Sequence, residues 1–216
     1  MHLEIMLILQ FVSIYIADAI ASYVYSIKRS SILFATVYIG SFALLNGLSM
    51  SQLFHGGSFN LQMIIVPVIA LAIQNTTYTI NKNFWSSLIV ESFAAAVVEE
   101  MLFRSLIPAN FDNLMTGEIV SGILFAIIHI KSFNITLDTT MRIFTTSILF
   151  DILMFQQRPN NVLYHFMWNF ITLSLVKSTD LSGTTITPIE ISNNTIILFT
   201  IVVLLNWINI ANTTHH

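Results

Sequence analysis

Apolar residues run along this chain in long unbroken stretches. Short polar breaks such as KRSS, HGGSFN, NKN and RPNN separate them, and the Gly, Pro, Asn and Ser residues of these breaks favour turns. Because a bilayer core of about 30 Å needs roughly 20 apolar residues per helix, the pattern predicts about eight transmembrane helices. The predicted helices cover residues 3–27, 31–50, 61–80, 84–109, 116–133, 139–156, 161–178 and 194–210.

The apolar stretches lack the two-residue alternation that is typical of membrane strands. The pattern therefore predicts an all-α, polytopic integral membrane protein, and strands are not expected. No repeat or linker divides the chain, so residues 1–216 are expected to form a single helical transmembrane domain with a motif core at 84–178. The first stretch lacks the basic start and the cleavage site of a signal peptide, so it is expected to be a retained helix. With about eight predicted helices, the chain is expected to be a multi-pass protein of the cell membrane.

Composition strengthens the membrane prediction and excludes some functions. Hydrophobic residues make up 55% of the chain and charged residues only 9%. The chain has no cysteine, so disulfides, thiolate nucleophiles and Cys-ligated metals are excluded. The net charge is -3 and the few basic residues are scattered, so a nucleic-acid partner is not expected.

Charged residues stand out in the predicted helix 84–109, which contains the sequence SFAAAVVEEMLFRSLIP. Ionisable side chains at membrane depth cost several kcal/mol and usually mark a functional site. Residues four apart share a helix face, whereas adjacent residues are rotated by about 100°. Glu99 and Glu100 therefore face different surroundings. The pairs four residues apart are Glu100 with Arg104, Phe125 with His129, and His165 with Asn169.

These groups can meet in one pocket, because their predicted depths below one membrane face are similar at about 1.5 Å of rise per residue. A carboxylate and an imidazole that share a water can deprotonate it for attack on a carbonyl carbon. A second imidazole and an amide can donate hydrogen bonds to the oxyanion that forms. The residue set thus fits peptide hydrolysis without a covalent intermediate.

Three short motifs give the chain a resemblance to a known family. EEMLFR (Glu99 to Arg104), FAIIH (Phe125 to His129) and HFMWN (His165 to Asn169) follow in this order, each on a hydrophobic helix. In this the sequence resembles the CPBP (Abi) intramembrane proteases, which include type II CAAX prenyl endopeptidases and bacteriocin-processing and self-immunity proteins. The resemblance implies a membrane-embedded peptidase that acts on a prenylated CAAX-like protein or a hydrophobic peptide in the lipid bilayer.

The resemblance also implies a role for each motif residue. Glu99 and His129 would activate water, and His165 and Asn169 would form the oxyanion site. Glu100, Arg104 and Phe125 would support them, with Glu100 paired to Arg104. Enzymes of this type are described as glutamate-dependent, so no cofactor is expected.

Several alternatives stay open at this point. Glu99, His129 and His165 are the ligand types of a zinc site, although no HExxH motif is present and each ligand would come from a different helix. Glu100 and Arg104 could form a purely structural ion pair. Other classes are a non-catalytic scaffold or immunity protein and a transporter, but the chain lacks the inverted repeats of the latter.

Three other acids within predicted helices, Asp18, Glu91 and Asp151, have no spacing that links them to the motifs. They could line the cavity, pair with Arg104 or bridge helices, and helix contacts are the favoured role. Sidedness is also open. The distribution of Lys and Arg places the pocket-side loops outside, whereas the prenyl endopeptidases open their pocket toward the cytosol.

Overall fold

The structure of the chain is a computed structural model, and it describes residues 3–49, 60–74, 78–80, 85–130, 136–157, 160–173, 175–177 and 192–213. Within these ranges the chain is almost entirely helical, as the pattern predicts. The elements are α1 (Leu3–Lys28), α2 (Ser31–Leu45), α4 (Gln62–Ala72), β1 (Tyr78–Ile80), α5 (Trp85–Met101), a π-helical turn η2 (Leu102–Leu106), a 3-10 turn η3 (Pro108–Asn110), α6 (Leu114–Ile130), α7 (Leu137–Gln156), α8 (Asn161–Leu173), β2 (Leu175–Lys177) and α9 (Asn193–Thr213).

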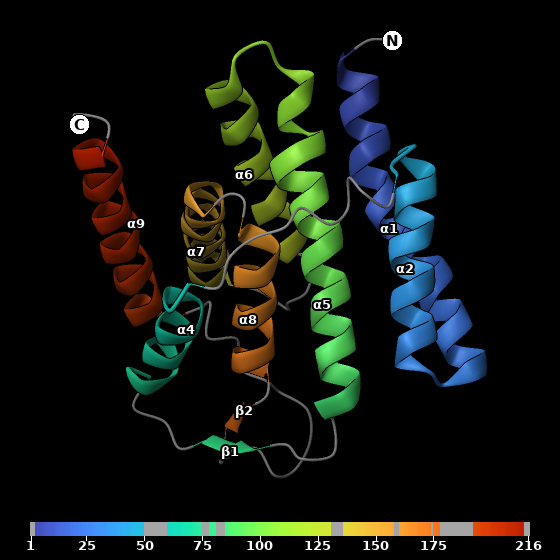
Figure 1. Cartoon of the computed structure of the whole chain (residues 1–216), viewed down its shortest axis with the longest axis horizontal. Coiled ribbons are helices and arrows are strands. Elements are labelled where there is room, and N and C mark those ends of the chain that lie inside the picture. The colour runs from blue at the N-terminus through green and yellow to red at the C-terminus, as the bar shows by residue number, and fades with distance from the viewer. Residues whose placement is uncertain are drawn as a thin grey trace.

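The helices form one bundle in which α5 and α8 are central (Figure 1). On one side α5 contacts α2, and α2 packs along α1. On the other side α8 contacts α4, while α6 packs on α7 and α7 on α9. The start of α1 and the end of α9 lie at the upper edge of Figure 1, whereas β1 and β2 lie at the lower edge.

Two predicted helices end early and continue as a small antiparallel ribbon. The predicted helix 61–80 gives α4 and then β1, and the predicted helix 161–178 gives α8 and then β2. In the ribbon, Tyr78 pairs with Lys177 and Ile80 with Leu175. Each strand has only three residues, which is too short for a two-residue alternation to show in the sequence.

The predicted helix 84–109 is interrupted after Met101 by the π-helical turn. Here the Ile107 N–H bonds to the Leu102 carbonyl, five residues back, at 3.0 Å. A π turn displaces carbonyls from the hydrogen-bond pattern of an α-helix. At this turn the Ser121 hydroxyl of α6 donates a hydrogen bond to the Phe103 carbonyl. This interruption places Arg104 on a widened turn that is braced by α6.

A close backbone approach fixes α6 against η3. A Cβ on Gly117 would lie 2.8 Å from the Cα and the carbonyl oxygen of Pro108, so only glycine fits there without movement. Gly122, further along α6, lies against α7, since a Cβ there would come 3.0 Å from Asp151 Oδ2. The glycines therefore set the distance of α6 from the segments that carry Arg104 and Asp151.

Among the described residues, two helical segments are long and apolar enough to cross a membrane, Leu3–Lys28 and Asn193–Ile210. Shorter apolar helices are Ser31–Leu45, Gln62–Ala72 and Leu114–His129. Large apolar side chains cover the outside of α9, where Trp207 is 63% exposed and Ile197 57%. Of the about eight predicted transmembrane helices, two are thus long and apolar enough to be candidate spans in the described part of the chain, so the polytopic prediction is supported only in part.

Candidate active site

A buried ion-pair cluster lies where α5, η2 and α7 meet. Arg104 Nε is 3.3 Å from Glu100 Oε2, and Arg104 Nη2 is 3.3 Å from Asp151 Oδ1. The side chains of all three residues are at least 96% buried. The Arg104 guanidinium also lies over the Phe125 ring, with its central carbon 4.5 Å from the ring centroid, which adds a cation-π contact. One arginine therefore compensates two buried carboxylates.

His165 of α8 extends this cluster toward the two motif glutamates. Its Nδ1 lies 2.6 Å from Glu100 Oε1, a short hydrogen bond in which Nδ1–H donates to the carboxylate. Its Nε2 lies 3.8 Å from Glu99 Oε2. Asn161, one helical turn before His165, brings its side chain within hydrogen-bonding range of Glu100. The ring of His165 is thus oriented from one side by a buried carboxylate that is itself held by Arg104.

His129 of α6 is oriented by its own helix. Its Nδ1 lies 2.8 Å from the carbonyl oxygen of Phe125, so Nδ1–H donates and the neutral ring keeps its lone pair on Nε2. The Phe125 and His129 rings are 4.4 Å apart between centroids, and Phe125 also packs edge-on to Phe103. Phe125 therefore fixes both the tautomer and the position of His129, which leaves Nε2 available to accept a proton.

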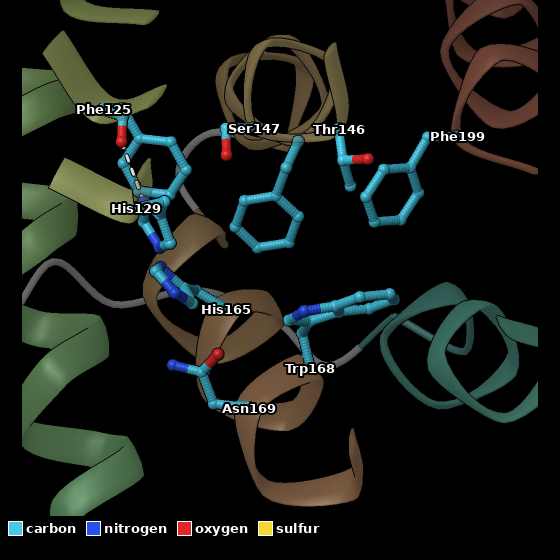
Figure 2. Close-up of a pocket in the computed structure, with 9 residues that line it drawn as sticks. Phe125, His129, Thr146, Ser147, His165, Trp168, Asn169 and Phe199 are labelled. Atoms are coloured by element: carbon cyan, nitrogen blue, oxygen red, sulfur yellow. Dashed lines mark hydrogen bonds between the residues drawn. The ribbon is translucent and has the colours of Figure 1, made fainter. Parts of the chain in front are cut away.

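A pocket opens between α6, α7, α8 and α9 (Figure 2). His129, His165 and Asn169 form one part of its wall, and aromatic rings form another. The space open to the centre of a water molecule is about 40 Å³. A polar space of this size is large enough to hold water. The lining residues are Phe125, His129, Thr146, Ser147, Phe150, His165, Trp168, Asn169 and Phe199.

The structure brings the predicted site residues together, with one difference in pairing. The predicted contact between Glu100 and Arg104 is present. Glu99, which was expected to share a water with His129, instead has its carboxylate beside His165 and is not among the pocket-lining residues. Both Glu99 and His129 lie in the part of the chain that the structure describes, and no direct hydrogen bond or ion pair joins them. A water shared by Glu99 and His129 would have to lie between the pocket and the Glu99 carboxylate.

Sequence reasoning left three contributors without a role: Asp151, Ser147 and Asn161. Asp151 pairs with Arg104, which was one of the alternatives for this acid. Ser147 lies four residues before Asp151 and lines the pocket, so both lie on one face of α7. This S-x-x-x-D spacing was the signal available in the sequence. The sequence also left open the roles of two more acids in predicted helices, Glu91 and Asp18. Glu91 accepts a hydrogen bond from Ser31 at 2.9 Å, and Asp18 is exposed on α1.

A zinc site would need Glu99, His129 and His165 to converge on one point. Within the described ranges, no group of three His, Cys, Asp or Glu side chains is placed to hold a metal ion. Both ring nitrogens of His165 face carboxylates, and His129 offers only Nε2. The donor geometry therefore does not fit the zinc alternative, and the absence of a cofactor stays a prediction.

Comparison with protein families identifies the segment that carries the site. Residues 81–171 match the family described as type II CAAX prenyl endopeptidase Rce1-like. This match supports the resemblance to the CPBP (Abi) family that the three motifs indicate. The matched segment contains all three motifs and spans α5, α6, α7 and most of α8. Comparisons with curated proteins and with solved structures each found no match.

The matched segment is less than half of the chain, but it holds all three motifs and every pocket-lining residue except Phe199. The contacts of Glu99, Glu100, Arg104, His129 and His165 described above all lie inside the matched segment.

Proposed function

We propose that this protein is a multi-pass membrane endopeptidase that hydrolyses a prenylated CAAX-like protein or a hydrophobic peptide near the membrane surface. The observation that carries the proposal is the pocket itself. Within the family segment, the side chains of His129, His165 and Asn169 line one space with room for water, and the Glu99 carboxylate lies 3.8 Å from Nε2 of His165. Neither a nucleic acid nor a metal is part of the proposal.

In the proposed reaction, a pocket water is activated by Glu99 and His129. His129 Nε2 accepts a proton while the water oxygen bonds to the carbonyl carbon, and the carbonyl π electrons move to the oxygen. When the carbonyl re-forms, the C–N bond breaks, its electron pair leaves with the nitrogen, and the nitrogen takes the proton back. The products are a carboxylate and an amine, with no covalent intermediate.

The oxyanion site of this proposal consists of Asn169 and His165. The amide of Asn169 can donate two N–H bonds and lies one helical turn after His165 on the same pocket wall (Figure 2). Because Nδ1–H of His165 is engaged by Glu100, His165 donates from Nε2 only when both ring nitrogens carry a proton. Donors of this kind, fixed before the reaction, usually contribute a large share of the rate.

The aromatic part of the pocket supports a hydrophobic substrate. Phe150 and Phe199 are 5.8 Å apart between ring centroids, and Trp168 packs against both. Such a wall favours an apolar side chain next to the bond to be cleaved.

The test uses the purified full chain in detergent or liposomes with internally quenched peptides, both farnesylated CAAX-like and unmodified hydrophobic ones. We expect wild type to cleave at least one peptide, and Glu99→Gln and His129→Ala to lose more than 100-fold in rate. Glu91→Gln is the matched control, because Glu91 lies on the same helix but bonds to Ser31 outside the pocket. It should remain close to wild type.

Each assay is repeated after exhaustive chelation, and activity is expected to survive. Loss of activity that zinc restores would favour the metalloprotease alternative. If no peptide is cut while Glu99→Gln keeps the cellular effect of the wild type, the protein is a scaffold or immunity protein and the protease proposal is wrong.

A further inference from the structure

Ser147 of α7 carries a pocket hydroxyl that the motifs do not explain. The residue is 5% exposed and lines the pocket with His129. A serine hydroxyl within a helix commonly bonds to the carbonyl four residues earlier, as Thr145 does with Met141. Within the part of the chain that the structure describes, the Ser147 hydroxyl makes no such bond. Figure 2 shows it pointing from α7 into the pocket.

Helix register places this hydroxyl at the level of the His129 ring. α7 follows α6 after a short connection and packs along it, so the two helices are antiparallel. Gly122 lies opposite Asp151. Ser147, four residues before Asp151, therefore lies about 6 Å further toward the end of α6, level with Ala126.

The His129 ring reaches the same level, because it folds back along its helix. Its Nδ1 bonds to the carbonyl of Phe125, one turn before His129 and next to Ala126. Side chains on helices lean toward the N-terminus in this way. The hydroxyl and the ring thus approach the same part of the pocket from facing helices.

We propose that Ser147 and His129 together hold the hydrolytic water. A bound water needs two to four polar partners, and Glu99 does not line this pocket. The Ser147 hydroxyl donates to the water oxygen, while one water proton points to Nε2 of His129. This arrangement aims the second lone pair of the water at the carbonyl carbon. Ser147 keeps its own proton and forms no bond to the substrate.

This inference rests on the proposed protease function. The alternative for the same hydroxyl is a covalent serine nucleophile with His129 as its base. A third role is a hydrogen bond to the bound peptide, which would act on binding rather than on the chemical step. The experiments below separate these roles.

The first experiment compares Ser147→Ala, Ser147→Thr and Thr145→Ala with wild type on the peptides that wild type cleaves. Thr145→Ala removes a hydroxyl of the same helix that donates to the Met141 carbonyl of that helix. We expect Ser147→Ala to lower kcat about tenfold with KM unchanged, as for one lost hydrogen bond to a positioned group. Ser147→Thr should restore most of kcat, and Thr145→Ala should match wild type.

Other outcomes overturn the inference. A kcat of Ser147→Ala equal to wild type removes Ser147 from the reaction while leaving the protease proposal intact, provided that His129→Ala is inactive. A raised KM with unchanged kcat assigns Ser147 to substrate binding. Labelling of Ser147 by a fluorophosphonate probe, with complete loss of activity in Ser147→Ala, makes it the nucleophile.

The second experiment needs no activity. A structure of the resting wild type at a resolution that shows waters should contain one within about 3.2 Å of both Ser147 Oγ and His129 Nε2. The same water should be absent or displaced in Ser147→Ala. A resting pocket without a water shared by these two atoms contradicts the inference, whether or not a cleavable peptide is known.

Discussion

Arg104→Gln removes the guanidinium that lies between two buried carboxylates. In the wild type, Arg104 is 3.3 Å from both Glu100 and Asp151, and the side chains of the cluster are 0–4% exposed. Glutamine is polar but carries no charge, so the two buried carboxylates lose the cation that pairs with both of them. Breaking a buried ion pair by removing one partner costs about 3–5 kcal/mol. We expect the upper part of this range, because two acceptors are affected.

The chain provides a matched control in Arg142→Gln. Arg142 also pairs with an acid four residues earlier, with Nε 2.8 Å from Asp138 Oδ2, and it also has a second partner in Asn193. This pair is 31% and 72% exposed, so solvent screening limits its contribution to roughly 0–1 kcal/mol. The two substitutions therefore differ mainly in the burial of the pair.

Thermal unfolding in detergent measures the difference. For a chain of this size, 1 kcal/mol changes the Tm by about 2–4 °C. Arg104→Gln should lower the Tm by roughly 10 °C or more, and Arg142→Gln by less than about 4 °C. A triple variant with Glu100→Gln and Asp151→Asn added to Arg104→Gln should unfold closer to wild type, because no unpaired charge remains. Equal effects of the two single substitutions would refute the role of burial in this cluster.

Two further predictions concern packing and the oxyanion site. Gly117→Ala should lower the free energy of unfolding by about 1–3 kcal/mol, because the added methyl meets the Pro108 backbone at 2.8 Å. Gly40→Ala should raise it by up to about 1 kcal/mol, because a Cβ there has nothing within 4 Å and alanine favours the helix. Tm measurements check both substitutions. Asn169→Ala should lower kcat by about 100- to 1000-fold with little change in KM, because the lost amide donates in the transition state. A raised KM with unchanged kcat would instead assign Asn169 to substrate binding.

The helical fold followed from the sequence because long apolar stretches between turn residues allow few other structures. The ends of the elements did not follow as well. Nothing in the pattern of 84–109 marks the π turn after Met101, since a one-residue widening leaves the hydrophobic composition unchanged. β1 and β2 depend on pairing between segments almost 100 residues apart, which periodicity within one segment does not report.

The candidate site was predictable where its residues share a helix. Four-residue spacing gave the contact of Glu100 with Arg104 and the placement of His129 next to Phe125. Contacts between helices were harder to obtain, because they depend on how the helices rotate against each other. For this reason the sequence did not show that His165 lies between both glutamates or that Asp151 pairs with Arg104.

The central claim is that Glu99 and His129 act on one water although, among the described contacts, no hydrogen bond or ion pair joins their side chains. A double-mutant cycle on kcat tests it most directly, with wild type, Glu99→Gln, His129→Ala and the double variant assayed on one cleaved peptide. Residues that act as a unit are strongly non-additive. The account predicts that the double variant is no slower than the slower single variant. A double variant whose loss equals the product of the two single losses would contradict it, because the two residues would then contribute to separate steps.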